Sequence, residues 1–260
     1  MPYIRTKGII IREVNTGESD KSVAIFTREL GKVYAYARGA RKYKGSISQA
    51  AGYFCYGEFL LYKIRDSYSI KSFQIEESFY NIRNDLCKLA YASHFAEIIS
   101  YSVQEELPSE ELLRLLLNTL HYLAGADCKS DDPSGEGRTP ELLCAVFELR
   151  ALAILGFGPE TEVCAECGAE PGACDDFLFS FEKCGLVCGS CRGNDVSAIS
   201  ISNDAALAIR HIVQSDDGGL FAFRLKGKPL RELGVITRRY LRERLGHDFI
   251  KPDFIRQISF

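Results

Sequence analysis

The segment Val163 to Asn194 contains two short cysteine motifs, Cys164-Ala-Glu-Cys167 and Cys188-Gly-Ser-Cys191, with twenty residues between them. Two residues between the thiolates of each motif let one tight turn direct both sulfurs at the same ion, and a glycine stands beside each turn. Four thiolates fill the tetrahedral shell that zinc prefers and leave no position for water. The spacing therefore predicts a zinc ribbon with one structural zinc ion, bound by Cys164, Cys167, Cys188 and Cys191.

The same cysteines could instead form disulfides or hold an iron–sulfur cluster. The chain starts with a strand-like segment and lacks the apolar run of a signal peptide, so a cytosolic chain that binds a metal is the favoured interpretation. Cys174 and Cys184 are expected to be bystanders, although Cys184 is spaced to offer a substitute ligand. The scattered cysteines are expected to be small buried hydrophobic residues: Cys55, Cys87, Cys128 and Cys144.

Charge is unevenly distributed along the 260 residues, although the formal net charge is only -3. Residues 1–80 contain 13 Lys and Arg against 8 Asp and Glu, residues 81–223 contain 9 against 23, and residues 224–260 contain 10 against 4. A polyanion is therefore expected to be attracted to both ends and repelled by the middle. With 46% hydrophobic residues and no apolar run of membrane length, the chain is expected to be a cytoplasmic protein of two or three modules.

Residues 1–80 show the pattern of a small β-barrel. Turn-forming residues separate five strand-like segments of moderate length. These segments are Ile4–Val14, Lys21–Glu29, Lys32–Arg38, Tyr53–Arg65 and Tyr68–Glu76. Their number and spacing predict an OB-fold barrel, with a different small β-barrel as the alternative.

A basic stretch free of acidic residues lies between Glu29 and Glu58 in this predicted barrel. Its cations are Lys32, Arg38, Arg41, Lys42 and Lys44, and its interleaved aromatic residues are Tyr34, Tyr36, Tyr43, Tyr53, Phe54 and Tyr56. Cations that meet phosphates beside rings on which bases stack are what a single-stranded nucleic-acid groove requires. The five cations are therefore predicted to bind DNA. The alternative is a solvated loop beside a barrel core, since many of the rings must face inward to fill the barrel.

Helical periodicity begins at Ile82 and sets the remaining boundaries. Predicted helices follow an apolar stripe from Leu86 to Val103, a cap at Ser109, a Thr139-Pro140 start, a cap at Ser202, and Pro229. The fold class is thus α+β with several domains. The predicted domains are an OB-fold barrel over 1–80, a helical domain over 81–162, an inserted zinc ribbon over 163–194, and the C-terminal part of the helical domain over 195–260.

The last predicted helix, Pro229 to Leu245, carries many arginines outside its apolar face. Such charges are common on a solvated helix face. Residues 224–244 nevertheless contain eight basic residues against two acidic ones, Glu232 and Glu243. A second DNA surface is therefore a candidate here, with contacts from Arg238, Arg239 and Arg242.

The order of these parts resembles the RecO family of bacterial DNA repair proteins along the whole chain. The resemblance rests on four stretches: Thr27-Arg-Glu-Leu-Gly-Lys32, Arg38-Gly-Ala-Arg-Lys42, Leu86 to Ile99, and Leu155-Gly-Phe157. It implies a recombination mediator that binds single- and double-stranded DNA, anneals complementary strands, works with RecR and helps RecA replace single-stranded-DNA-binding protein. It also implies a nucleoid-associated location and a DNA-binding role for Arg38, Arg41, Lys42 and Lys44. Departures from the family pattern are Cys174, Cys184 and the stretch Tyr43-Lys-Gly-Ser46.

Two other classes of function remain as alternatives. An enzyme, such as a zinc-dependent hydrolase or nuclease, is disfavoured because the two motifs fill the zinc shell and neither HExxH nor a GxxxxGK[ST] phosphate loop occurs. A structural adaptor would use the acidic helical region for protein contacts and would not touch DNA. The prediction is therefore a protein without catalytic residues.

Overall fold

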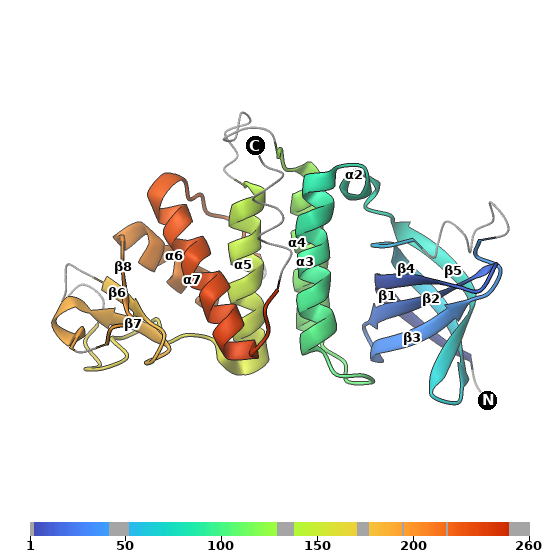
Figure 1. The fold of residues 1–260 in the computed structure, drawn as a ribbon, viewed down its shortest axis with the longest axis horizontal. Coiled ribbons are helices and arrows are strands. Elements are labelled where there is room, and N and C mark those ends of the chain that lie inside the picture. Colours follow the sequence, from blue (N-terminus) through green and yellow to red (C-terminus); the bar gives the residue numbers. More distant parts are fainter. Residues whose placement is uncertain are drawn as a thin grey trace. The chain divides into compact units, whose positions relative to one another are not determined.

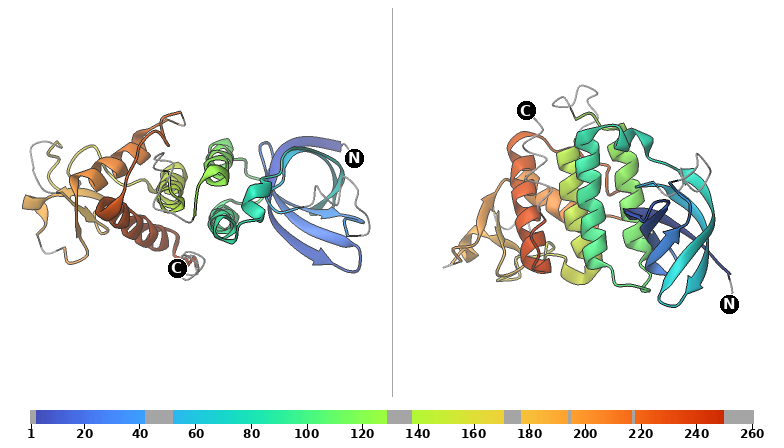
Figure 2. Two further views of the ribbon diagram at one scale, coloured as in Figure 1. Left: turned by 90° about the horizontal axis from the view of Figure 1, so that it is seen from above. Right: turned by 45° about the vertical axis from the view of Figure 1, so that its right-hand side comes forward.

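The computed structural model describes residues 3–41, 52–128, 138–170, 177–193, 195–216 and 218–249. Contacts divide the chain into two compact units, one up to Ala124 and one from Gly125 to Phe249 (Figures 1 and 2). The division falls inside the predicted helical domain over 81–162, because the first two long helices group with the barrel.

A closed five-stranded barrel begins the first unit, in the strand order β1-β2-β3-β5-β4. Its strands are β1 (Tyr3–Thr16), β2 (Asp20–Thr27), β3 (Gly31–Ala37), β4 (Tyr56–Ile64) and β5 (Ser67–Glu77). β1 pairs antiparallel with both β2 and β4, while β3 and β5 are parallel. The five predicted strands are thereby confirmed, and the closed barrel with this count is consistent with an OB-fold.

Alternating side chains explain why these segments form a barrel. Residues such as Ile10, Ile25 and Phe59 are fully buried inside the barrel, and the residues between them along each strand point to its other face. β4 and β5 approach closely at Gly57, where an added Cβ would lie 2.0 Å from the carbonyl oxygen of Gln74. Only glycine fits at this irregular point of the β4–β5 register.

Three helices complete the first unit: α2 (Tyr80–Arg83), α3 (Leu86–Ser102) and α4 (Glu110–Gly125). The side chain of Asp85 caps α3 by accepting hydrogen bonds from the backbone amides of Cys87 and Lys88. α3 packs against β1, which explains why three consecutive residues of that strand, Ile9 to Ile11, are all buried. The short helix α2 was not predicted from the sequence.

The second unit contains α5 (Pro140–Leu152), η1 (Ala153–Phe157), α6 (Asn203–Gln214) and α7 (Gly227–Leu245). The predicted caps are confirmed, because the hydroxyls of Thr139 and Ser202 accept from the amides of Leu142 and Ala205. Gly246 ends α7 in the left-handed conformation, with φ of 63°. No helix in the described parts of the chain is both long and apolar enough to cross a membrane.

A small sheet carries the cysteine motifs in the second unit. Its strands, β6 (Phe177–Ser180), β7 (Gly185–Cys188) and β8 (Ile199–Ile201), have the order β7-β6-β8. The sheet packs on α7 through Phe179, whose ring meets the ring of the buried Tyr240 edge-on with centroids 5.4 Å apart. This aromatic contact is one of those that hold the cysteine-bearing sheet against the last helix.

Candidate nucleic-acid interface and metal centre

The turn after β3 presents two of the predicted DNA-binding cations. Arg38 and Arg41 are exposed there, and three hydrogen bonds tie the turn to the β1–β2 turn and to the first residue of β2. The amide of Gly39 donates to Oδ1 of Asp20 at 2.8 Å, the amide of Arg41 donates to the carbonyl of Ser19 at 2.9 Å, and Nη1 of Arg41 donates to the carbonyl of Gly17 at 2.8 Å. Lys42 and Lys44 lie outside the described residues.

Lys32 occupies a different environment from the one expected. It is 8% exposed, and its Nζ donates to the backbone carbonyl of Ser100 in α3 at 2.6 Å. Burial lowers the pKa of its ammonium group, and the charge of Glu105 opposes this only in part. The ammonium group thus joins the barrel to α3, and we leave Lys32 out of the proposed DNA surface.

We predict that Lys32→Met destabilises the protein without altering its response to salt in DNA binding. The methionine keeps much of the side-chain volume, but the carbonyl of Ser100 loses a charged donor, which is expected to cost about 1–3 kcal/mol. Urea unfolding measures the loss. A shallower salt dependence of DNA binding in a folded Lys32→Met protein would contradict this placement.

Aromatic residues of the basic stretch divide between the core and the surface. Phe54 is fully buried and stacks on Tyr53 with ring centroids 3.9 Å apart, and burial raises the pKa of Tyr53. Tyr36 is 43% exposed and Tyr34 is half-buried on β3, while Tyr43 lies outside the described residues. Phe54 is thus buried just before β4 begins, whereas Tyr36 on β3 is accessible from solvent.

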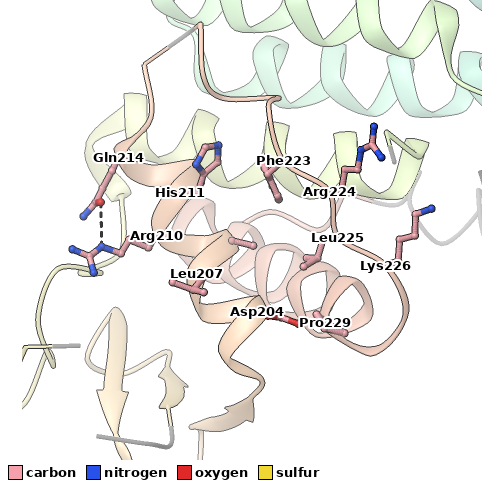
Figure 3. A pocket seen from close by; sticks show the side chains of 11 residues that line it. Asp204, Leu207, Arg210, His211, Gln214, Phe223, Arg224, Leu225, Lys226 and Pro229 are labelled. Atoms are coloured by element: carbon pink, nitrogen blue, oxygen red, sulfur yellow. Dashed lines mark hydrogen bonds between the residues drawn. The ribbon is translucent and has the colours of Figure 1, made fainter. Parts of the chain in front are cut away.

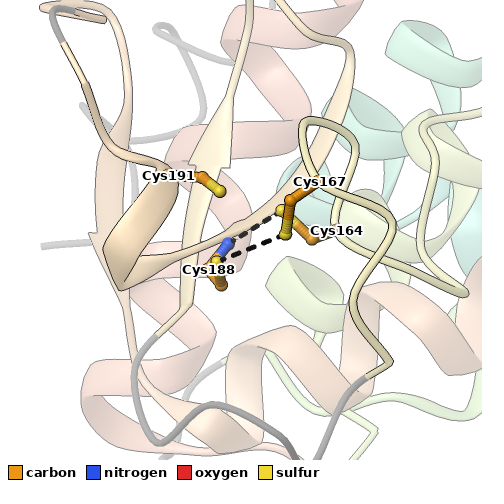
Figure 4. Close-up of side chains that lie close together, drawn as sticks. All are labelled: Cys164, Cys167, Cys188 and Cys191. Atoms are coloured by element: carbon orange, nitrogen blue, oxygen red, sulfur yellow. Dashed lines mark hydrogen bonds between the residues drawn. The ribbon is translucent and has the colours of Figure 1, made fainter.

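The four predicted zinc ligands lie together (Figure 4). Their sulfur atoms are all within 4.8 Å of one another, although the motifs come from a turn near Cys164 and from the end of β7. The turn closes through a hydrogen bond from the amide of Gly168 to the carbonyl of Cys164, with φ of 72° at Gly168. The predicted grouping of these cysteines is confirmed, and the four-cysteine cluster is compatible with a metal ion.

The sulfur–sulfur distance and the pKa of Cys164 are compatible with a metal ion at the cluster. Zinc–sulfur bonds of about 2.3 Å place tetrahedral ligands about 3.8 Å apart, and the sulfurs of Cys167 and Cys188 are 3.9 Å apart. Burial disfavours the Cys164 thiolate, but the backbone amides of Cys167, Cys188 and Glu166 outweigh burial and lower its pKa to about 6. The thiolate form that binds metals is therefore favoured at this position.

The segment with the cysteine motifs contains two further cysteines, Cys174 and Cys184. Cys184 accepts a hydrogen bond from Nη1 of Arg244 at 3.1 Å and does not belong to the cluster of four. Cys174 lies outside the described residues. The structure thus places Cys184 against α7, where it contacts an arginine instead of completing the candidate metal site.

Several arginines of α7 make contacts within the second unit. The guanidinium of Arg239 lies 3.9 Å from the ring centroid of Phe181 and pairs with Glu243 at 2.7 Å. Arg238 is half-buried, whereas Arg242 is exposed and lies 3.8 Å from the carboxylate of Asp248. Of the three predicted contacts of the second DNA surface, Arg242 is thus the most accessible.

An open groove that the sequence did not reveal lies between α6 and the segment 223–229 (Figure 3). Its volume is about 620 Å³, and its walls include Leu207, Arg210, Arg224 and Lys226. His211 fixes one side, because its Nε2 donates to the carbonyl of Gly219 at 3.0 Å while Nδ1 is 3.1 Å from the hydroxyl of Ser215. Residues separated by up to 25 positions form this groove, so no local pattern signals it.

These features define a class: a protein with a closed small barrel, an exposed basic turn, a helical part and a four-thiolate cluster. The family models described as Recombination protein O N terminal and Recombination protein O C terminal match residues 1–79 and 83–252. The chain therefore belongs to the RecO family of DNA repair and recombination proteins.

Individual relatives agree with this family. The DNA repair protein RecO of Acetivibrio thermocellus is 40% identical over 100% of this chain and 98% of its own length. Proteins of the same name from Caldicellulosiruptor saccharolyticus and Bacillus subtilis are 30% and 29% identical, over 100% and 98% of this chain and 100% and 94% of their own lengths. These names describe a DNA repair protein, as the resemblance in the sequence implied.

Proposed function

We propose that this chain is a recombination mediator that binds single- and double-stranded DNA without sequence specificity and anneals complementary strands. The observation that carries the proposal is the exposed basic turn of Arg38 and Arg41, held in place by hydrogen bonds to the β1–β2 turn, on the barrel of a chain that belongs to a DNA repair family. Lys42 and Lys44 continue this basic stretch in the sequence. Contacts to phosphates rather than base edges make the binding insensitive to sequence.

Annealing follows from charge neutralisation and needs no catalytic residue. Two complementary strands repel each other through their phosphates, and arginine and lysine side chains that bind those phosphates release counterions and reduce the repulsion. Bases remain available for pairing because the contacts are made to the backbone. Arg242 on α7 is the best-placed residue for a second contact, with Arg238 and Arg239 beside it in the sequence.

The proposal also includes protein partners and one structural metal ion. The chain is proposed to act with RecR in helping RecA replace single-stranded-DNA-binding protein, in the bacterial cytoplasm at the nucleoid. The acidic middle of the sequence is a natural region for protein contacts, since it repels DNA. One zinc ion held by the four clustered cysteines would fix the small sheet beside α7 and take no part in a reaction.

The proposal predicts that neutralising the basic turn flattens the salt dependence of DNA binding. Fluorescence anisotropy of a mixed-sequence single strand is measured across a salt series for wild type and for the Arg38/Arg41/Lys42/Lys44 quadruple alanine variant. Each phosphate contact contributes about 0.7 to the logarithmic salt slope for single strands, so loss of four contacts lowers the slope by up to about 3. A duplex and a scrambled single strand are expected to respond similarly.

A matched control removes exposed arginines elsewhere. Arg114→Ala/Arg192→Ala takes away two exposed arginines that lie outside the barrel and is expected to leave the slope unchanged. Arg38→Ala/Arg41→Ala provides the comparison at equal charge. If wild type binds DNA weakly, or if the two double variants behave alike, the barrel turn is not the DNA surface and the adaptor function takes its place.

A further inference from the structure

A second surface of the barrel, toward the other end of β1, carries two tyrosines side by side. Tyr3 on β1 and Tyr62 on β4 are direct partners in the antiparallel register, with ring centroids 5.6 Å apart and planes inclined by 49°. Tyr3 is 59% exposed and Tyr62 is half-buried. Cross-strand aromatic pairs stabilise a sheet, but a pair this accessible also offers a ring face to a ligand.

Cations border this pair on β5 and on β1 itself. The Nζ of Lys71 on β5 lies 5.4 Å from the ring centroid of Tyr62. Lys71 reaches this position through a β-bulge, because Leu60 pairs with Ser72 and Leu61 pairs with Ile70, which leaves Lys71 as the extra residue. Bulges redirect single side chains, and this one brings an exposed ammonium group beside the tyrosine pair.

Arg5 supplies a second charge on the same face, two residues along β1 from Tyr3. Its side chain is 74% exposed and meets the carboxylate of Glu58 only at 3.4 Å, a surface pair that contributes little stability. Ile64, 37% exposed and two residues beyond Tyr62, extends the apolar area of this face. Exposed rings flanked by an arginine and a lysine combine the two components of single-strand binding, which are stacking and phosphate neutralisation.

We propose that Tyr3, Tyr62, Lys71 and Arg5 form a base-stacking site for single-stranded DNA, separate from the basic turn. The site rests on the proposed function, and it adds a preference for unpaired bases that a phosphate-binding turn does not supply. Tyr3 begins β1, whereas Gly17, the carbonyl partner of Arg41, follows its last residue. The two sites therefore lie toward opposite ends of one long strand and contact different parts of a bound single strand.

The first test compares a thymidine oligonucleotide with a hairpin duplex. Tyr3→Ala/Tyr62→Ala is expected to weaken single-strand binding by about 5- to 100-fold, because each lost stacking contact has an effect of this order. Duplex affinity is expected to stay within about twofold, since paired bases are already stacked inside the helix, and the salt slope is expected to be unchanged. Tyr3→Phe/Tyr62→Phe keeps both rings and is expected to keep wild-type affinity.

Tyr80→Ala is the matched control, since Tyr80 is 62% exposed and lies on α2 outside the barrel. Thermal unfolding confirms that each variant is folded. If the double alanine variant loses single-strand and duplex affinity equally, or loses neither while wild type binds DNA, the stacking site is wrong and the basic turn stands. If wild type binds no DNA, the proposed function and the site both fail.

A fluorescent probe at the site reports directly on base stacking. The chain has no tryptophan, so Tyr62→Trp introduces a single reporter of its own surroundings. A base that stacks on this ring quenches its fluorescence, and the thymidine oligonucleotide is expected to quench Tyr62→Trp strongly and Tyr80→Trp weakly. Equal quenching at both positions would overturn the site, as would quenching of Tyr62→Trp by an acidic peptide but not by the oligonucleotide, which would identify a protein surface.

Discussion

Replacing Cys164 or Cys188 by serine is expected to abolish the proposed metal binding and to unfold the small sheet. Both cysteines are 3% exposed and lie within 4.8 Å of the other two sulfurs, so a serine leaves an incomplete shell in a closed site. Zinc binding reaches about 10–16 kcal/mol in small zinc-binding peptides, and much of it is folding free energy. Elemental analysis is expected to fall from about one zinc per chain to nearly none.

Chelation provides the same test without a substitution. A strong chelator is expected to lower the unfolding temperature of wild type, and zinc is expected to restore it. Cys184→Ser is the control, because Cys184 contacts Arg244 and stands apart from the four-sulfur cluster. Full zinc content in Cys164→Ser and Cys188→Ser, or a wild-type protein that is purified without metal and ignores the chelator, would contradict a structural zinc ion.

Tyr240→Ala is expected to produce the other large effect, a loss of about 3–5 kcal/mol in the free energy of unfolding. Tyr240 is 1% exposed, its ring meets Phe179 of the small sheet, and the guanidinium of Arg244 lies 5.2 Å from its centroid. Removing the ring leaves a cavity where the sheet meets α7. Urea unfolding measures the change, and a loss below about 1 kcal/mol would show that the sheet does not depend on this contact.

The variant Tyr240→Phe keeps the ring and removes the hydroxyl, so it measures the contribution of the hydroxyl alone. Burial raises the pKa of Tyr240 to about 12, with the nearby Cys184 adding to the effect. The neutral phenol is thus favoured in the folded protein, and its stabilisation is present below the ordinary pKa of about 10 and is lost as pH rises from about 10 to 12. The phenylalanine variant is expected to stay folded at neutral pH and to lose less stability over that alkaline range. Identical alkaline profiles would contradict the shift.

Structural features that depend mainly on residues close together in the sequence were predictable. The caps at Thr139 and Ser202 act on amides three residues away, so both were predictable, as were the five strands of the barrel. The clustering of the four cysteines was predictable too, because two residues between thiolates leave few alternatives. The binding of zinc and the DNA contacts remain predictions.

Long-range contacts account for what the sequence did not reveal. Lys32 looks like a DNA-binding cation until the carbonyl of Ser100, 68 residues later, is placed beside it. Arg239 and Arg244 look like free charges of a basic helix, yet both contact Phe181, about 60 residues earlier. A charge count records each cation but not the partner that folding supplies, so it overestimates the surface available to a polyanion.

The pairing of β1 with both β2 and β4 has a consequence for biosynthesis. β1, β2 and β3 can form adjacent hairpins as soon as they leave the ribosome, because each pairs with its neighbour in sequence. The pairing of Tyr3 with Tyr62 and the parallel pairing of β3 with β5 must wait until the later strands have emerged. During that interval the free edges of β1 and β3 are open to incorrect partners, so a translational pause before β4 is expected to increase aggregation of the nascent chain.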